Sequence, residues 1–346
     1  MHLFSPLYIQ GMAQISIQPP LGDDWMHEAT PTNEAYTRAN DPVFRDFLSP
    51  LEARRMGKLL KRAAIVSERA LQEGNTACPE NIYTGTGLGC VESTEEFLEK
   101  LCRQGEHLLS PSHFMQSTHN TISSLIAIRT HCHGCNMTFS HKTFSFEQAL
   151  NEALMSHCCE ASSHFLIGGY DEVTPSYFTL LRRAGYVGNP GQVSCSETAM
   201  AALLSTTANG ALARLEAFGM GQRANHEAPS DVLRHFLTAN HLSATDIDAI
   251  LTGANGVPAN DNRYASCCAP VCPNVPQLAY KSVFGENYTV SALGFYAAVR
   301  MLQHAVWPQT MRVVSGRLPQ TPPRRLLLMN LDADGGYALT MLSSIS

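Results

Sequence analysis

Apolar and polar positions follow two different periods along the chain, and their alternation predicts an α/β protein. Short apolar runs with strand character are followed by segments in which apolar side chains recur every three or four residues, as in an amphipathic helix. Residues 135–139 form such a run. Apolar residues then repeat at helical spacing at Phe146, Ala149, Leu150, Ala153 and Leu154. The pattern predicts strand, tight turn and helix across residues 135–154.

Other stretches follow the same pattern and extend the prediction to most of the chain. Strand character is expected at residues 7–17, at the start of 81–101, at 163–175 and at 193–206. Helical spacing is expected within residues 41–71, at the end of 81–101 and at 231–240. Strands that alternate with helices are typical of an α/β domain.

The turn after residue 139 carries the first candidate chemistry. It contains Ser140, His141, Lys142, Thr143 and Ser145, all polar, at the point where a buried strand meets the N-terminus of a helix. The free N–H groups of a helix N-terminus favour negative charge. Nucleophile elbows are built in this way, so we interpret the turn as the centre of a site.

Composition excludes several classes of function. The chain has 346 residues, 44% of them hydrophobic, and can bury one large core or two smaller ones. A net charge of −6 leaves no basic face for nucleic acid. The first twenty residues lack a basic region followed by a continuous apolar run, and no 18 successive residues are all apolar. We therefore expect a cytoplasmic protein with no nucleic-acid partner and no membrane span.

Cysteines and glycines give no clear sign of a metal or a cofactor. The odd count of 11 cysteines favours reduced thiols over a disulfide framework. The HCHGC stretch at 131–135 has zinc-binding residue types, but the adjacent Cys158 and Cys159 lack the spacing of a second ligand pair. Gly85, Gly87 and Gly89 do not form the G-x-G-x-x-G pattern of a nucleotide loop. Neither a metal nor a cofactor is expected.

Several stretches resemble, in the correct order, the motifs of one enzyme family, the β-ketoacyl-acyl carrier protein synthases or ketosynthases. They are the helix region with Arg54, Arg55 and Met56, the glycine-rich turn at 85–89, the loop at 110–120 that ends in His119 and Asn120, the segment 120–143, the phrase at 252–262 with Pro258 and Asp261, the stretch from Lys281, Ser282 and Gly285 to residue 302, and the final stretch with Asn330, Gly335 and Gly336. The resemblance covers nearly the whole chain.

This resemblance implies a thiolase-type α/β fold, in which two similar halves form five layers of helix and sheet. The expected halves are residues 1–175 and 176–346. It also implies a dimer formed through the strand next to the nucleophile turn, and a pocket bordered by the matching positions His119, Asn120, Lys281, Asn330, Gly335 and Gly336. Acyl carrier protein is an expected partner of such a protein.

The chain departs from the family at all three catalytic positions. The cysteine nucleophile and the two histidines are replaced by Thr143, Gly253 and Glu286. A thiolate accepts the acyl group and two imidazoles stabilise the enolate in this chemistry, and losing one such donor typically costs on the order of 10²- to 10³-fold in rate. We expect no condensation by this chain alone, and we expect Lys281 to form a buried ion pair with Glu286.

Three functions remain open at this point. In the first, the chain is a non-elongating subunit similar to the chain-length factors, which partner an active ketosynthase in fatty acid or polyketide-type synthesis. In this interpretation the chain resembles the short ketosynthase-like proteins of aryl polyene and flexirubin-type pathways. In the second, it is a 3-oxoacyl-carrier-protein synthase or acyltransferase with another nucleophile, such as Thr143, Ser145, Cys90 or Cys195. In the third, it is a homodimer that binds acyl chains or carrier protein.

Overall fold

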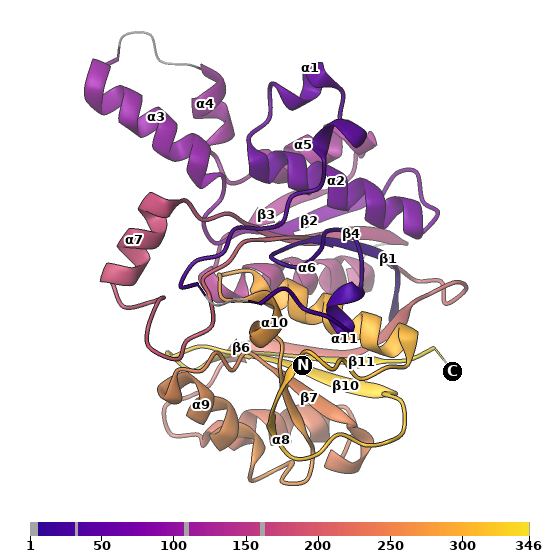
Figure 1. Ribbon diagram of the computed structural model, residues 1–346. Coiled ribbons are helices and arrows are strands. Elements are labelled where there is room, and N and C mark those ends of the chain that lie inside the picture. The colour runs from indigo at the N-terminus through magenta and orange to yellow at the C-terminus, as the bar shows by residue number, and fades with distance from the viewer. Residues whose placement is uncertain (1–5, 32–33, 107–110, 160–162, 346) are drawn as a thin grey trace.

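Helices and sheets alternate in five layers in the computed structural model of the chain, which describes residues 6–31, 34–106, 111–159 and 163–345 (Figure 1). The outer layer of the first half contains α2 (Lys58–Glu73) and α5 (Thr121–Thr130). The middle layer contains α6 (Ser145–Cys159) and α11 (Val290–His304). The outer layer of the second half contains α8 (Pro229–Ala239) and α9 (Pro258–Cys268). The expected thiolase-type architecture is confirmed.

The described residues also form the strands and several further helices. The strands are β1 (Leu7–Ile15), β2 (Asn81–Gly85), β3 (Asn136–Phe139), β4 (His164–Asp171), β5 (Thr198–Ser205), β6 (Ala213–Gln222), β7 (Ala249–Thr252), β8 (Gln277–Ala279), β9 (Arg312–Ser315), β10 (Arg325–Leu331) and β11 (Gly336–Ser343). The other helices are α1 (Pro50–Ala53), α3 (Val91–Gln104), α4 (Pro111–Gln116), α7 (Pro175–Arg183) and α10 (Lys281–Phe284). The 3₁₀ turns in the described part of the chain are η1 (Asp24–Met26), η2 (Phe44–Asp46), η3 (Lys142–Phe144) and η4 (Ala244–Asp246).

Strand order shows that the two halves are repeats of each other. The sheet runs β3-β2-β4-β5-β1-β6-β11-β10-β7-β8-β9. Two sets of five strands have the same chain order and the same sequence of parallel and antiparallel pairs when each is followed toward the middle of the sheet. They are β3-β2-β4-β5-β1 and β8-β7-β10-β11-β6. Residues 7–9 and 213–215 provide the only pairing between these two sets in the part of the chain that is described.

The repeat assigns β5 to the first half, because β5 lies between β4 and β1. The expected division into residues 1–175 and 176–346 stays a prediction. It would separate β5 from β4 and β1, the two strands with which β5 pairs. We propose instead that the halves meet within residues 206–212, between the end of β5 and the start of β6.

Three apolar clusters hold the layers together. The largest lies between the two sets of strands and includes Phe146 on α6 and Phe295 on α11. Every residue of α11 from 290 to 302 is buried, as expected for a helix covered on both faces. The other two clusters pack α2 and α8 against the outer faces of the sheet. Burial of apolar surface in these layers stabilises the fold independently of the polar turns between them.

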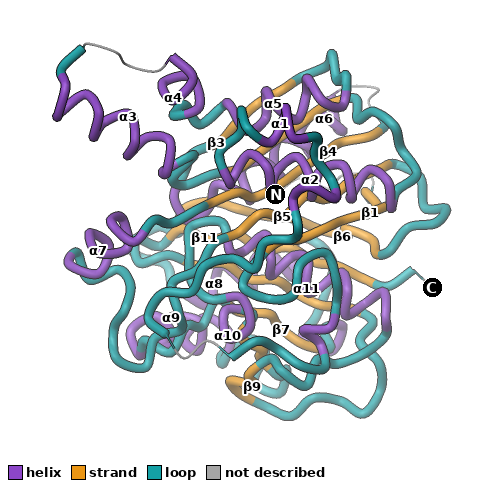
Figure 2. Tube along the Cα trace, turned by 45° about the horizontal axis from the view of Figure 1, so that its top comes forward, coloured by secondary structure: helices purple, strands orange, loops and turns teal. Residues whose placement is uncertain are grey.

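Several features of the described residues are uncovered in a single chain, and two of them are relevant to a partner. Strand β3 pairs with β2 on one side only and forms an edge of the sheet. Helices α3 and α4 project away from the layers, as both ribbon and tube views show (Figures 1 and 2). Among the helices of the described residues, none combines the length and the apolar character needed to cross a bilayer.

Candidate functional site

The turn that carries Thr143 is a sharp connection between β3 and α6. Lys142 has a φ of 47°, a left-handed conformation that costs energy for a residue with a side chain. Ser145 stabilises the turn, because its hydroxyl accepts the His141 N–H at 2.9 Å and donates to the Lys142 carbonyl at 2.7 Å. Gly85 allows the close approach of α6, since a Cβ there would lie 2.3 Å from the Ser145 carbonyl. The elbow expected from the sequence is confirmed.

Asn330, near the end of β10, holds the start of α6 in place through two hydrogen bonds. Its side-chain amide donates to the Thr143 carbonyl at 2.7 Å and to the Glu147 carboxylate at 2.8 Å. Glu147 is fully buried one helical turn after Thr143. Burial raises the pKa of the Glu147 carboxyl to about 7, while hydrogen bonds and the nearby Lys281 ammonium act in the opposite direction.

Lys281 and Glu286 form the buried ion pair expected from the sequence. Lys281 Nζ lies 2.7 Å from Glu286 Oε1, and the two side chains are 8% and 13% exposed. The Asn255 amide donates to the second carboxylate oxygen of Glu286 at 2.7 Å. Both charges are therefore neutralised within the protein, and Glu286 is held as a carboxylate that accepts hydrogen bonds instead of donating one.

Gly253 lies behind this pair, where two buried tyrosines occupy the space of a side chain. A Cβ at Gly253 would lie 2.4 Å from the Tyr264 hydroxyl, 3.0 Å from the Tyr280 hydroxyl and 3.2 Å from Lys281 Cε. The Gly253 carbonyl accepts a hydrogen bond from the Asn260 amide at 2.9 Å. An imidazole has no room at this position.

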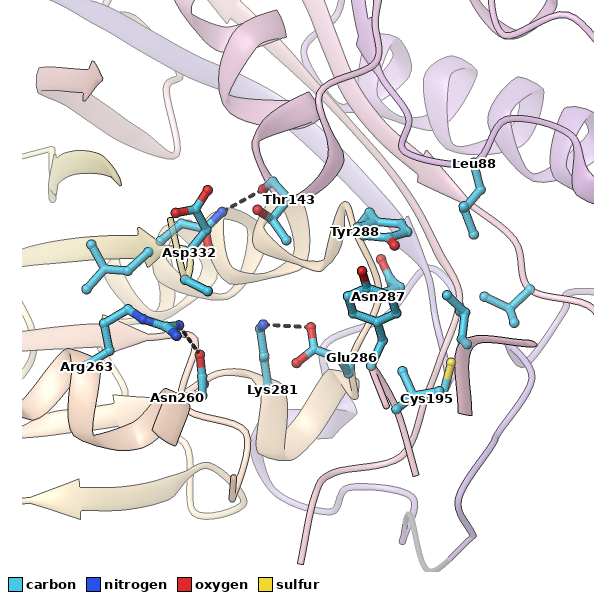
Figure 3. A pocket seen from close by; sticks show the side chains of 17 residues that line it. Leu88, Thr143, Cys195, Asn260, Arg263, Lys281, Glu286, Asn287, Tyr288 and Asp332 are labelled. Atoms are coloured by element: carbon cyan, nitrogen blue, oxygen red, sulfur yellow. Dashed lines mark hydrogen bonds and ion pairs between the residues drawn. The ribbon is translucent and has the colours of Figure 1, made fainter. Parts of the chain in front are cut away.

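A cavity of about 180 Å³ brings together four of the residues predicted from the sequence: Thr143, Lys281, Glu286 and Asn330 (Figure 3). Gly335 and Gly336 line a smaller neighbouring pocket, and the Gly336 N–H donates to the Asp332 carboxylate at 2.7 Å. The structure places His119 and Asn120 among the exposed residues and outside the lining of this cavity.

Sequence reasoning missed most of the remaining polar lining, which includes Asn260, Arg263, Asn287, Tyr288 and Asp332. These residues reach the cavity from α9, from the segment before α11 and from the turn after β10. Nothing in the local pattern separates them from ordinary surface positions. Glu147 had a signal that could have been used, because it occupies the same helical face as Leu150 and Leu154, and a carboxylate on an apolar face indicates a buried polar partner.

The alternative nucleophiles are poorly placed for covalent chemistry. Cys195 lines the cavity, but burial and the nearby carboxylates of Glu286 and Glu197 raise the pKa of its thiol to about 12. Burial also raises the pKa of the Cys90 thiol. Ser145 uses its hydroxyl within the turn. The described residues that line this cavity include no histidine, and His141 instead lines a larger neighbouring pocket that Thr143 also borders.

The HCHGC stretch forms a tight turn instead of an open coordination site. The Cys132 thiol contacts the Glu80 carbonyl at 3.4 Å, and the Cys78 thiol contacts the His131 carbonyl at 3.4 Å. A Cβ at Gly134 would lie 1.8 Å from the Glu80 carbonyl oxygen. Within the described ranges, no three His, Cys, Asp or Glu side chains are arranged to bind a metal ion.

Glu147→Gln is expected to change how stability depends on pH. Since the folded-state pKa of Glu147 is raised from 4.5 to about 7, its contribution is greatest below pH 4.5 and is lost as the pH rises to about 7. That displacement corresponds to about 3 kcal/mol. The variant should therefore gain about 2 kcal/mol relative to wild type between pH 5 and pH 8, measured by urea unfolding at both pH values.

The exposed Glu99→Gln variant on α3 serves as the matched control and should follow wild type at both pH values. Parallel pH profiles for wild type and Glu147→Gln would contradict the assignment of a buried, proton-binding carboxylate.

The five layers, the repeated strand order and the elbow before a central helix define a thiolase-type protein. The chain belongs to the β-ketoacyl synthase family, whose N-terminal domain model matches residues 25–249. No curated protein matches its sequence.

Solved structures with the same fold cover 99% of this chain and 100% of their own. The ishigamide ketosynthase/chain length factor has a TM-score of 0.81 and 17% sequence identity. A β-ketoacyl synthase from Burkholderia phymatum has a TM-score of 0.77 and 15% identity. AntDE:AntF, a type II PKS acyl-carrier protein in complex with its ketosynthase bound to the hexaketide, has a TM-score of 0.77 and 12% identity.

Proposed function

We propose that the protein is a non-elongating, chain-length-factor-like subunit that pairs with a catalytically intact ketosynthase. The observation that carries the proposal is the Lys281–Glu286 ion pair beside Thr143. A carboxylate held in this way accepts hydrogen bonds from Lys281 and Asn255 and has none to donate to the oxyanion formed when carbon dioxide leaves. A threonine hydroxyl without an adjacent base is a weak nucleophile.

Shape similarity supports this kind of partner. The structure with the TM-score of 0.81 is described as a ketosynthase/chain length factor, and another similar structure holds an acyl-carrier protein in complex with its ketosynthase. We extend both kinds of partner, a ketosynthase and an acyl carrier protein, to this chain. We also propose a cytoplasmic location and a pathway of the aryl polyene or flexirubin type, because the chain resembles the short ketosynthase-like proteins of those pathways.

The uncovered β3 edge of the sheet supports the proposed contact with the partner. Strand β3 has backbone groups without a strand on its outer side, and such edges tend to pair with another strand. Apolar side chains gather near it, since Met137 on β3 is 40% exposed and Ile128 on the neighbouring α5 is 73% exposed. A protein partner that adds a strand to β3 would cover both side chains.

Ile128→Glu and Met137→Glu are each expected to weaken association with the partner at least tenfold, because each places a carboxylate in an apolar contact. Association is measured by co-purification with, and titration against, ketosynthases that keep the cysteine and both histidines. Leu180→Glu is the matched control, since Leu180 is 58% exposed on α7, away from β3. Equal loss of binding in all three variants, or in none, would contradict the assigned contact.

Incubation of the isolated protein with octanoyl and malonyl carrier proteins tests the absence of catalysis. We expect no acyl adduct in the intact mass and no carbon–carbon bond formation, whereas the assembled pair with an active ketosynthase should elongate the acyl chain. An adduct on Thr143 together with a condensed product from the isolated chain would overturn the proposal.

A further inference from the structure

The cavity beside Thr143 has an apolar end and a polar end. Leu88, Val173, Leu181 and Val187 line the apolar end and belong to, or pack against, a small apolar cluster of their own. Asn260, Arg263 and Lys281 lie together on the opposite side of the cavity, from α9 and α10 (Figure 3). A cavity with this division suits a small molecule that has an apolar tail and a polar head.

At the polar end of the cavity, one of the two positively charged side chains has an anionic partner and the other has none among the described residues. Lys281 is neutralised by Glu286 at 2.7 Å. The Arg263 guanidinium donates a hydrogen bond to the neutral Asn260 side chain at 3.0 Å and forms no ion pair with any described carboxylate. The carboxylate of Asp332, which lines the same end, accepts the backbone N–H groups of residues 334 and 336 instead. The half-buried Arg263 guanidinium therefore has donors that face the cavity without an anionic partner.

We infer that this cavity binds a free, medium-length monocarboxylic acid without forming a covalent bond, with the carboxylate on Arg263 and the hydrocarbon tail at the apolar end. The inference rests on the proposed non-elongating function and gives the inactive site a role as a receptor for a free acyl acid. A guanidinium matches a carboxylate with two parallel N–H donors, which is the geometry that favours arginine at such sites.

The volume of the cavity and the charges that line it limit which ligands can bind. The cavity of about 180 Å³ holds roughly a dozen or more water-sized groups at about 10–15 Å³ each, which is enough for the non-hydrogen atoms of an eight-carbon acid. Glu286 is already paired with Lys281, and the Asp332 carboxylate lines the same end, so a doubly charged phosphate head would meet one carboxylate and the single positive charge of Arg263. A head with a single negative charge meets less repulsion. A carboxylate is therefore favoured over a phosphate.

Isothermal titration calorimetry with octanoate tests the inference on the full chain. Wild-type protein should bind octanoate, and octanamide, which has the same length and no charge, should bind at least tenfold more weakly. Arg263→Gln should weaken octanoate binding at least tenfold, whereas Arg182→Gln, on the exposed surface of α7, should leave it within twofold. Equal affinity for octanoate and octanamide, no binding of octanoate, or an unchanged Arg263→Gln variant would each overturn the inference.

Two further measurements test the position of the tail and the chemical class of the head group. Leu181→Trp fills the apolar end and should weaken octanoate and octanamide equally, with the fold checked by circular dichroism. Octyl phosphate should bind more weakly than octanoate, and tighter binding would overturn the assignment to a carboxylate. An acyl adduct from carrier protein would contradict the proposed non-elongating function, while octanoate titration reports on the cavity alone, so the two failures are distinguishable.

Discussion

Gly253→His is expected to destabilise the protein by about 3 kcal/mol or more and to restore no condensation, even when combined with Thr143→Cys and Glu286→His. The reason is steric. A Cβ at this position already lies 2.4 Å from the Tyr264 hydroxyl and 3.0 Å from the Tyr280 hydroxyl. Both tyrosines are buried in packed layers and have little room to move. Urea unfolding measures the loss, and product analysis with malonyl carrier protein measures the activity.

Smaller changes serve as controls for this result. Gly253→Ala should cost about 1–3 kcal/mol, the usual range for an overpacked core. Gly253→Ala combined with Tyr264→Phe should recover part of that loss, because the hydroxyl at 2.4 Å is removed. Recovery will be incomplete, since the same hydroxyl accepts the Leu331 N–H at 3.2 Å. A Gly253→Ala variant as stable as wild type would contradict the steric argument.

Lys281→Met is expected to cost about 3 kcal/mol of unfolding free energy at neutral pH. The substitution keeps most of the side-chain volume but leaves Glu286 as a buried carboxylate without its cation. Breaking one partner of a buried ion pair typically costs about 3–5 kcal/mol, and the remaining hydrogen bond from Asn255 favours the lower end. Chemical unfolding of the purified variant at pH 7.5 provides the measurement.

The double variant Lys281→Met with Glu286→Gln separates loss of the charge pair from loss of packing. Without an unpaired charge, its cost should be about half that of Lys281→Met or less. The introduced glutamine would still accept the hydrogen bond from Asn255 through its amide oxygen. If the double variant is less stable than Lys281→Met alone, the pair is not the structural element described above.

Much of the fold could be predicted because local patterns and long-range packing agree. The strand at 135–139 and the apolar spacing from Phe146 correspond to β3 and α6. The final stretch with Asn330, Gly335 and Gly336 corresponds to β10, a tight turn and β11. These segments carry strong periods and clear turn residues, so tertiary structure does not override them.

Contacts between distant segments could not be predicted from local patterns. Tyr264 follows Gly253 by eleven positions and lies on a separate helix, yet its hydroxyl fills the space beside that glycine. Arg263 reads as an ordinary surface arginine until α9 is placed against the cavity. Likewise, the position of β5 between β4 and β1 depends on the order of the whole sheet. Periodicity describes which face of an element is apolar but not what that face meets.

The repeated strand order explains how this fold accommodates Thr143, Gly253 and Glu286 at its centre. Duplicated halves bring the beginnings of α6 and α11 to a common centre, so Thr143 and Glu286 sit on short connections while the apolar layers lie elsewhere. Mutation at that centre is nearly neutral for folding as long as volume and charge are balanced, as the tyrosines and the ion pair do here. In such an architecture the residues at this centre can change while the apolar layers keep the fold.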